Sequence, residues 1–321
     1  MFPVSPIYAA VELGSDSFRL HIGRFDDGAL HLVATMREKV GLSASLDEDG
    51  MLGAPALRSA LACLEQFRGA LDAWRPQAVR VVATTALRTA RNASLFLSAA
   101  GRALGHPVEL IAGDEAGRLV YLGVDNTLGP GATAPRLVLD IGSMSTELVI
   151  GEGAAIRRIE SFALGAVRQS LSFFANGQID AAGFDAAVRS CRSRFAEAGL
   201  GARGWQLAYG ACGTVRALAA IAQQHSGQDG PLAQPGLVRL RAAFIDAGHV
   251  THLRQAWPRA AHVAHSAHLA GGLALLTGLM EELEIAAVAP VHAGLRVGAL
   301  WDLHQRAETG VGALEEPFGR V

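Results

Sequence analysis

Residues 137–151 read LVLDIGSMSTELVIG, so that an apolar run is broken by an acid, a glycine and small hydroxyl residues and then resumes. Two short apolar runs joined by a turn of this composition predict a β-hairpin. Backbone N–H groups at a Gly-Ser turn can approach phosphate oxygens closely, and the hydroxyl groups add further donors. The stretch therefore predicts a hairpin that holds a phosphate group.

A shorter copy of this pattern lies near the N-terminus, where residues 9–22 read AAVELGSDSFRLHI. The order of apolar strand, acid, glycine, hydroxyl residues and returning strand is the same as in residues 137–151. The two hairpins make a weak internal repeat, and they predict two halves of the molecule that face one phosphate chain.

The composition indicates a globular protein of about two domains. The chain has 321 residues, of which 50% are hydrophobic, and its mean hydropathy is +0.25. The formal net charge of -2 argues against bulk attraction to nucleic acid. No apolar stretch reaches the roughly 20 residues that a membrane span needs, and the N-terminus lacks the pattern of a signal peptide. We therefore expect a soluble, cytoplasmic protein with neither nucleic acid nor a membrane as a partner.

The cysteines and histidines do not indicate a metal centre. Cys63, Cys191 and Cys212 are widely spaced and odd in number, which argues against a disulfide framework or a zinc site and fits a reducing compartment. Histidines recur at three-residue steps, which drift by about 60° per step around a helix and do not converge on one site. We expect reduced core cysteines and hydrogen-bonded or interfacial histidines. The histidines in question are His249, His252, His262, His265 and His268.

Strand-like and helix-like segments alternate along the chain. Apolar and β-branched runs predict strands at 7–24, 30–36, 79–84, 108–111, 137–150, 156–160 and 205–209. Helical spacing predicts helices at 57–71, 86–103, 166–174, 181–197 and 264–283, and one that Asp114 caps. This alternation favours layered α/β domains with helices covering a largely parallel sheet. Residues 126–135, rich in Gly, Pro and Thr, predict a linker between an N-terminal domain at 1–125 and a C-terminal domain at 126–321.

Seven segments resemble, in order, motifs of the exopolyphosphatase / guanosine pentaphosphate phosphohydrolase family (Ppx/GppA). They are VELGSDSFRLHIGRF at 11–25, VATTALRTARNASLFL at 82–97, ELIAGDEAGRLVYLGV at 109–124, LVLDIGSMSTELVIGEG at 137–153, SFALGAVRQSL at 161–171, YGACGTVRALAAI at 209–221 and GLRVGALWDL at 294–303. The resemblance covers nearly the whole chain. It implies α/β architecture with two actin-like (ribonuclease H-like) domains of the sugar kinase, actin and chaperone ATPase superfamily and a cleft between them.

The same resemblance implies an activity. Family members release the terminal phosphate of inorganic polyphosphate or of guanosine pentaphosphate, with magnesium and an in-line water, and dimerisation is a fair expectation. Longer members carry an additional C-terminal helical domain, and this chain resembles the two-domain form.

The matched motifs imply which residues form the site. Glu12 and Asp140 are expected to hold Mg²⁺, a divalent cation, and Glu147, or less favourably Glu115, to orient the attacking water. Arg296 also matches the family pattern. Thr214 is the expected N-cap of a helix whose N-terminus favours an anion. The residues expected to hold phosphate are Gly14, Ser15, Ser17, Arg88, Gly142, Ser145, Thr146, Arg168, Gly213 and Thr214.

Several positions depart from the family pattern. Ala116 stands where the family has its catalytic glutamate, and general-base help is worth about 10²–10⁴-fold in rate. Ser143 and Met144 replace glycines of the second hairpin turn; positive φ angles there would cost about 1–3 kcal/mol each, and Met144 could crowd the phosphate path. Glu12 replaces an aspartate, and Asp16 replaces an asparagine and adds negative charge.

The residues expected to hold phosphate therefore match the family pattern better than those expected to activate water. This leaves three functions open. The favoured one is a phosphoanhydride hydrolase of the exopolyphosphatase type. The second is a catalytically impaired sensor that binds polyphosphate or a nucleotide and signals by closing its domains. The third, a kinase-like user of ATP, shares the fold but lacks a recognisable acceptor-sugar site.

Overall fold

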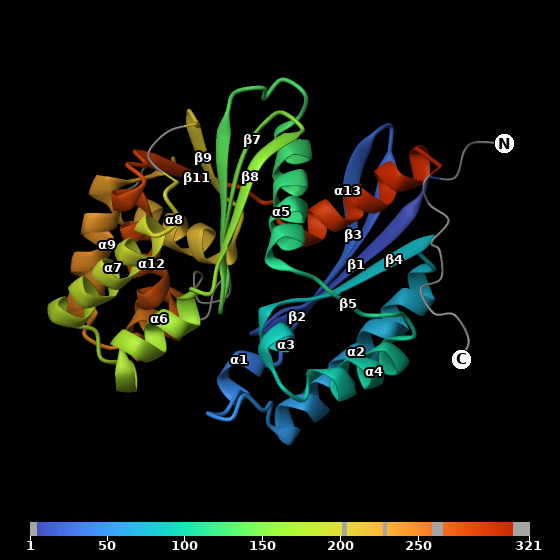
Figure 1. Ribbon diagram of the computed structural model, residues 1–321, viewed down its shortest axis with the longest axis horizontal. Helices are drawn as coiled ribbons and strands as arrows, with labels where there is room; N and C mark the ends of the chain where they lie inside the picture. Colours follow the sequence, from blue (N-terminus) through green and yellow to red (C-terminus); the bar gives the residue numbers. More distant parts are fainter. Residues whose placement is uncertain (1–4, 201–203, 227–229, 259–265, 311–321) are drawn as a thin grey trace.

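The computed structural model describes residues 5–200, 204–226, 230–258 and 266–310. The chain forms two β-sheets, each covered on its outer face by helices, with two further helices between the sheets (Figure 1). The first sheet has the strand order β3-β2-β1-β4-β5. Its strands are β1 (Ile7–Leu13), β2 (Ser17–Asp26), β3 (Ala29–Lys39), β4 (Ala78–Ala83) and β5 (Glu109–Leu110).

The second sheet repeats this topology. Its order is β10-β11-β9-β6-β7-β8, and β6-β7-β8 form an antiparallel meander while β6 pairs in parallel with β9. The strands are β6 (Arg136–Ile141), β7 (Thr146–Glu152), β8 (Ala155–Phe162), β9 (Leu207–Gly210), β10 (Leu232–Ala233) and β11 (Ala287–Pro290). Both predicted hairpins and the internal repeat are confirmed. The prediction of largely parallel sheets is wrong, because the meander in each half contributes antiparallel pairs to a mixed sheet.

Helices complete the two layers on either side (Figure 1). The helices are α1 (Leu42–Ser45), α2 (Ala54–Trp74), α3 (Thr85–Thr89), α4 (Ala93–Leu104), α5 (Gly113–Leu128), α6 (Ala166–Phe173), α7 (Ala181–Ala196), α8 (Gly213–Ser226), α9 (Gln234–Ala247), α10 (Val250–Ala256), α12 (Ser266–Glu282) and α13 (Leu295–Glu308), with a short 3-10 turn at Ala175–Gly177. In Figure 1, α2 and α4 cover the first sheet, α6, α7, α8, α9 and α12 cover the second, and α5 and α13 lie between the sheets.

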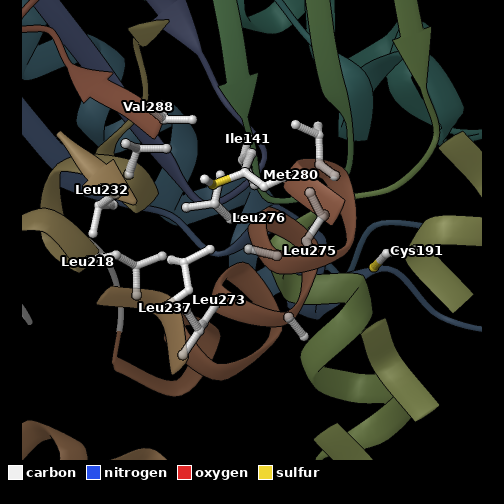
Figure 2. Close-up of a cluster of buried hydrophobic side chains, with 14 of the residues drawn as sticks. Ile141, Cys191, Leu218, Leu232, Leu237, Leu273, Leu275, Leu276, Met280 and Val288 are labelled. Carbon is white, nitrogen blue, oxygen red and sulfur yellow. The ribbon is translucent and has the colours of Figure 1, made fainter. Parts of the chain in front are cut away.

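Strand alternation divides the buried side chains into three cores. Successive residues of a strand point to opposite faces, so Val11 of β1 enters a core with α2 and α4, whereas its neighbour Ala10 faces the central core beside α5 and α13. In the second half, Leu139 of β6 faces an outer core that α12 dominates, and Val138 faces the central one. Figure 2 shows the α12 side chains Leu273, Leu275, Leu276 and Met280 among Ile141, Leu218, Leu232, Leu237 and Val288 of this outer core.

Two glycines allow α5 and α13 to cross closely. A Cβ atom on Gly298 would lie 1.7 Å from the carbonyl oxygen of Leu119, and one on Gly123 would lie 2.6 Å from that of Gly294. Any side chain at either position would force the helices apart. The contact places the N-terminus of α13 beside the strand ends of both sheets.

A cluster of buried and partly buried charges stabilises the same crossing. Arg80 of β4 contacts Glu115 of α5 at 2.7 Å and Asp302 of α13 at 2.8 Å, and Arg118 contacts both acids at 2.7 and 2.8 Å. Although α13 ends the described chain, it packs on β1, β2 and β4 of the first sheet. The predicted boundary at 125/126 follows sequence order, and the structure places this last helix against the first half.

Several local predictions need correction. The helix α5 begins at Gly113 after Ala112 and runs through Leu128, so Asp114 lies inside its first turn and residues 126–135 are not all linker. The predicted helix at 86–103 is interrupted between Thr89 and Ala93.

The cysteines and two of the histidines are held within the protein. Cys63, Cys191 and Cys212 are free and buried, as predicted. The rings of His249 and His252 bond to backbone carbonyl groups of Asn176 and Ala247. His262 and His265 lie outside the described residues. Every helix within the described ranges is too short or too polar to cross a lipid bilayer.

Candidate active site

A cavity lies where the carboxyl ends of the parallel strands of both sheets meet. The loops that follow β1, β4, β6, β9 and β11 all contribute to its wall, as is common for ligand sites in open α/β sheets. The cavity is lined by most of the residues expected in the site. These are Glu12, Gly14, Ser15, Ser17, Arg88, Asp140, Gly142, Ser145, Glu147, Gly213 and Thr214.

The first hairpin turn requires glycine for space. A Cβ atom at Gly14 would lie 2.7 Å from the carbonyl oxygen of Ser17, so any side chain would disturb the turn. The hydroxyl group of Ser15 accepts a hydrogen bond of 3.1 Å from the amide of Ala86, which anchors the turn to α3. Ser17 opens β2 and its Oγ accepts from Arg19 Nε at 3.1 Å.

The second hairpin turn is closed by a hydrogen bond of 2.9 Å from the Gly142 amide to the carbonyl group of Ser145. Gly165 lets the loop approach, because a Cβ atom there would lie 2.4 Å from the backbone of Ser143. Neither Ser143 nor Met144 has a positive φ angle, so the predicted strain of 1–3 kcal/mol at these positions is absent. Replacing the glycines has therefore left an unstrained turn.

Met144 crosses between the two halves. Its side chain is buried in the core of the first sheet, among residues that include Ala86 and Leu87 of α3, and it also lines the cavity. Burial of a methionine side chain contributes about 1.5–3 kcal/mol. The Met144 side chain thus packs the second turn against the first half, and the expectation that it crowds the phosphate path stays a prediction.

Hydroxyl groups and Arg88 form a chain across the cavity wall. Thr85 Oγ1 donates to Ser145 Oγ at 3.0 Å, and Arg88 Nη2 donates to Thr85 Oγ1 at 3.2 Å. Arg88 Nη1 also donates to the carbonyl group of Ile111 at 2.8 Å, which fixes the guanidinium group. The arginine and the two hydroxyl groups thus reach the cavity from opposite halves of the molecule.

Three predicted phosphate contacts have other partners. Thr146 is fully buried, and its hydroxyl group donates to the carbonyl group of Leu164 at 2.6 Å. Arg168 is exposed on α6 and donates to Ala163. Neither residue lines the cavity. Thr214 does line it, but it lies inside α8, and its hydroxyl group donates to Ile141 at 3.2 Å rather than capping the helix.

Glu147 is the most strongly perturbed acid of the cavity. Burial and the neighbouring charge of Asp140 raise its pKa to about 8, although Ser161 and Ser145 donate to its carboxylate and oppose the shift. Ser161 Oγ lies 3.2 Å from Glu147 Oε1. Asp140 faces Glu147 across β6 and β7. Two carboxyl groups held side by side cannot both ionise easily, so Glu147 can carry a proton near neutral pH.

Asp140 is also perturbed, but in a different setting. Burial and the charge of Glu12 raise its pKa to about 6, and Arg216, Arg19 and Arg296 oppose this shift. Asp140 therefore ionises before Glu147 as pH rises.

Glu12 is already paired. Its carboxylate forms an ion pair with Arg296 at the start of α13, and Arg296 Nε donates to His21 Nε2 at 3.2 Å. Burial and the charge of Arg296 lower the pKa of His21 to about 3, so the ring is neutral and accepts this bond. The donor set for Mg²⁺ is therefore smaller than the motifs imply, since Asp140 is the predicted ligand without such an ion pair.

Glu115 is directed away from the cavity. It accepts hydrogen bonds from Arg118 and Arg80, and these outweigh burial and lower its pKa. It does not line the cavity, whereas the next residue, Ala116, does. Adjacent helical residues point about 100° apart, so Glu115 cannot serve from the position of Ala116.

Sequence reasoning missed three arginines that line the cavity, and it gave Arg296 no role. Arg19 faces Glu12 across β1 and β2, and Arg37 faces Arg19 across β2 and β3. Arg216 lies in the first turn of α8. The signal for Arg19 was available, since it is two residues beyond Ser17 on the same face of a predicted strand. Arg37 and Arg216 required the register and the packing.

Magnesium fits this arrangement only in part. Mg²⁺ is usually bound by one or two carboxylates together with substrate phosphates and water. Among the described residues no group of three or more His, Cys, Asp or Glu side chains is arranged to hold a metal ion. Asp140 offers one carboxylate at the cavity wall, so the remaining ligands would have to come from phosphate oxygens and water.

Comparison with known proteins gives one consistent family. The model of the Ppx/GppA phosphatase family matches residues 21–307. Two curated relatives are named guanosine-5'-triphosphate,3'-diphosphate pyrophosphatase. The one from Vibrio campbellii is 35% identical over 302 residues, covering 93% of this chain and 59% of the relative. The one from Vibrio cholerae is 33% identical over 308 residues, covering 94% and 60%. The chain thus spans about three fifths of the length of these relatives.

Solved structures agree on the fold. A Ppx/GppA family member from Aquifex aeolicus has a TM-score of 0.81 at 23% identity, covering 95% of this chain and 99% of its own. An exopolyphosphatase from Cytophaga hutchinsonii has a TM-score of 0.82 at 20% identity, covering 95% and 98%. The predicted pair of actin-like domains is confirmed. The chain belongs to the Ppx/GppA phosphatase family.

Proposed function

We propose that this protein is a phosphoanhydride hydrolase that releases a terminal phosphate. One observation carries the proposal: Glu147, an acid whose pKa is raised to about 8 by burial and Asp140, lines the same cavity as the hairpin turns and Arg88. A group that titrates near neutral pH beside an anion-binding wall is suited to general-base catalysis. Glu147 would orient the attacking water in place of the acid that Ala116 lacks.

The turns supply the phosphate contacts in this proposal. Amide groups of the two hairpin turns and the Ser145 hydroxyl group would donate to the phosphate being transferred. The guanidinium group of Arg88 would neutralise charge that develops on its oxygens. Magnesium, when bound, would neutralise further charge on the phosphate chain, with Asp140 as its protein ligand. Glu12 is paired with Arg296 and so is a weaker candidate for that role.

Inorganic polyphosphate is the substrate that the cavity wall favours. Among the described residues that line the cavity there is no Phe, Tyr or Trp, whose large rings are common platforms for stacking a base, although His268 lines it. Five arginines line it, and forked guanidinium donors suit bidentate contacts with phosphate. Guanosine pentaphosphate is the second candidate, because the curated relatives are named as pyrophosphatases of that nucleotide.

The test is phosphate release measured beside binding of the same ligand. With magnesium, wild-type protein should release phosphate from long-chain polyphosphate, and Asp140→Ala should reduce release by at least about 10²-fold. Tight binding with turnover no better than that of Asp140→Ala would identify a silent sensor instead.

A gain-of-function variant tests the position of the base. If Glu147 serves as the base in place of residue 116, Ala116→Glu only adds a third acid to Asp140 and Glu147. The substitution should then not raise turnover. A large gain with Ala116→Glu would show that wild-type protein lacks an effective base.

A further inference from the structure

The second hairpin turn is held by both halves of the molecule. The first two amide groups of α6 donate to the carbonyl groups of Gly142 and Ser143 at 2.9 and 3.0 Å, so the second half fixes one side of the turn. Ser145 Oγ accepts a hydrogen bond of 3.0 Å from Thr85 Oγ1 of α3, which belongs to the first half. The turn therefore lies between a helix of each half.

The Met144 side chain makes the apolar part of this connection. It is buried in the core that β1, β2, α2 and α4 form on the outer face of the first sheet. Among the described residues of that core it alone comes from the second half, and its packing there is called here the Met144 contact. Gly165 leaves room for the Met144 backbone, because a Cβ atom there would lie 2.4 Å from Met144 N. A glycine at position 144, as in the family pattern, could not form this contact.

The Met144 contact bears on the site because the proposed phosphate donors are divided between the halves. Ser145 belongs to the second half and Arg88 to the first, and Thr85 joins them by hydrogen bonds of 3.0 and 3.2 Å. A hydroxyl group that lines a cavity can exchange a protein partner for water at small net cost. The Met144 side chain cannot leave its core without exposing apolar surface to water. The apolar contact is therefore the firmer of the two connections.

The Met144 contact also restrains the angle between the halves. The halves meet a second time in the central core, where Gly123 and Gly298 let α5 and α13 cross closely. Halves that meet at one crossing can move relative to each other, since packed helices can slide or turn. Because Met144 belongs to a different core, it adds a separate point of attachment. Two attachments in separate cores restrict a rotation that either one alone permits.

We propose that Met144 is a positioning residue, which packs the second hairpin turn on the first half and so keeps Ser145 and Arg88 at the spacing that one phosphate group requires before the ligand arrives. This inference rests on the proposed function for the choice of phosphate donors. A protein that is held in its binding arrangement does not lose affinity to unproductive arrangements. Loss of the side chain should therefore raise KM and leave kcat nearly unchanged, since Glu147 is not altered.

A matched pair of substitutions tests this role. Met144→Ala removes the Met144 contact, whereas Met36→Ala shortens a methionine of β3 that packs on the same core from within the first half. Met144→Ala should raise the KM for long-chain polyphosphate by about three- to thirtyfold and change kcat by less than about twofold. Calorimetry without magnesium should show the same weakening for sodium tripolyphosphate. Met36→Ala should change neither quantity by more than about twofold, and Met144→Leu, of similar volume, should restore the wild-type values.

A distance measurement tests the attachment directly. Spin labels are placed on Leu95→Cys of α4 and Leu171→Cys of α6, because both positions are exposed and they lie in different halves. The native cysteines are buried. Pulsed electron paramagnetic resonance on the full chain without ligand should give a narrow distance distribution for the wild-type and Met36→Ala backgrounds. Met144→Ala should broaden the distribution, and tripolyphosphate should narrow it again.

Two results would overturn the positioning role. One is a distance distribution in Met144→Ala as narrow as that of wild-type protein. The other is an equal loss of affinity in Met36→Ala, which would reduce Met144 to a contributor to core stability. Thermal unfolding without ligand identifies a folding defect. If Met144→Ala is misfolded, Met144→Val keeps part of the apolar contact, and a smaller change in the same direction decides.

The distances and the affinities do not depend on turnover, so the proposed function can fail separately. A broadened distribution and weaker binding in Met144→Ala, with no phosphate release by wild-type protein, would retain the positioning role and refute the hydrolase. Phosphate release by wild-type protein, with distances and affinity unchanged in Met144→Ala, would retain the hydrolase and refute the positioning role.

Discussion

The two hairpins occupy equivalent places in the two sheets, yet their cross-strand neighbours are opposite in charge. In the first sheet, Glu12 faces Arg19, which faces Arg37. In the second, Asp140 faces Glu147, which faces Ser161. Side chains opposite each other on neighbouring strands interact directly. The same motif therefore places arginines opposite the acid of the first hairpin, and it places a second acid opposite that of the second hairpin, where both carboxyl pKa values are raised.

In the proposed mechanism, this difference would separate phosphate binding from proton transfer. The carboxylate of Glu12 faces Arg19 and forms an ion pair with Arg296. A carboxylate that faces another carboxylate resists ionisation and becomes available as a base near neutral pH. Duplication of the hairpin, followed by divergence of the facing residue, would produce binding in one half and proton transfer in the other.

The largest expected effect comes from removing the proposed base, Glu147, from the row of Asp140, Glu147 and Ser161, called here the acidic row. Glu147→Gln should lower phosphate release by about 10²–10⁴-fold while tripolyphosphate binding is retained. In wild-type protein kcat/KM should rise with pH through about 8, because Glu147 must lose its proton to act. Steady-state kinetics from pH 6 to 9.5 check this, with Glu152→Gln of the same strand as control. A flat pH profile, or full activity in Glu147→Gln, would remove Glu147 from the mechanism.

The same group should make stability depend on pH. Its pKa is raised from 4.5 to about 8 in the folded protein, so the proton stabilises the fold. This contribution is complete below about pH 4.5 and is lost as pH rises through about 8. Glu147→Gln should therefore gain in Tm relative to wild type between pH 5 and pH 9. An unchanged difference in Tm across that range would show that Glu147 is not buried as a protonated acid.

A smaller effect should distinguish Arg88 from Arg168, both of which the sequence predicted to hold phosphate. Arg88 lines the cavity and Arg168 does not, so Arg88→Gln should weaken tripolyphosphate binding by about ten- to a hundredfold. Arg168→Gln should change it by less than about twofold, as expected of an exposed charge. Calorimetric titration measures both, and equal losses would show that the α6 arginine reaches the ligand after all.

Glu12, which is paired with Arg296 in the first sheet, should contribute less to ligand and metal binding. If Glu12 serves Arg296, Glu12→Gln should change tripolyphosphate affinity by no more than about threefold and leave the Mg²⁺ dependence of phosphate release unchanged. Asp140→Asn is the matched change in the second row, and it should raise the Mg²⁺ concentration needed for half-maximal activity. A rise of the same size in Glu12→Gln would establish Glu12 as a metal ligand. Thermal unfolding checks that both variants are folded.

The smallest effect concerns the end of the acidic row. Ser161 donates to the Glu147 carboxylate, so Ser161→Ala should raise the pKa of Glu147 further and lower phosphate release at pH 7 by about two- to tenfold. The loss should disappear at pH 9.5, where Glu147 is ionised in both proteins. Ser193→Ala, exposed on α7, is the control. A loss that is independent of pH would assign Ser161 a structural role.

The sequence by itself determined the local structure and the family. Apolar alternation and the Gly-Ser turns were enough to predict both hairpins, because these depend on residues that are close in sequence. Family motifs led to most of the cavity wall, including Arg88, Asp140 and Glu147. Thr146 and Arg168 matched the motifs too, but a motif does not specify whether a side chain is directed toward the cavity.

Only the tertiary structure decided the charges and partners of the site. The pairing of Glu12 with Arg296 joins residues from opposite ends of the chain, and Arg216 reaches the cavity through the packing of α8. The raised pKa of Glu147 requires its burial and the register that sets it opposite Asp140. Electrostatic interactions act through distance in space and through exclusion of water. Neither the distance between two groups nor their burial can be derived from the local order of residues.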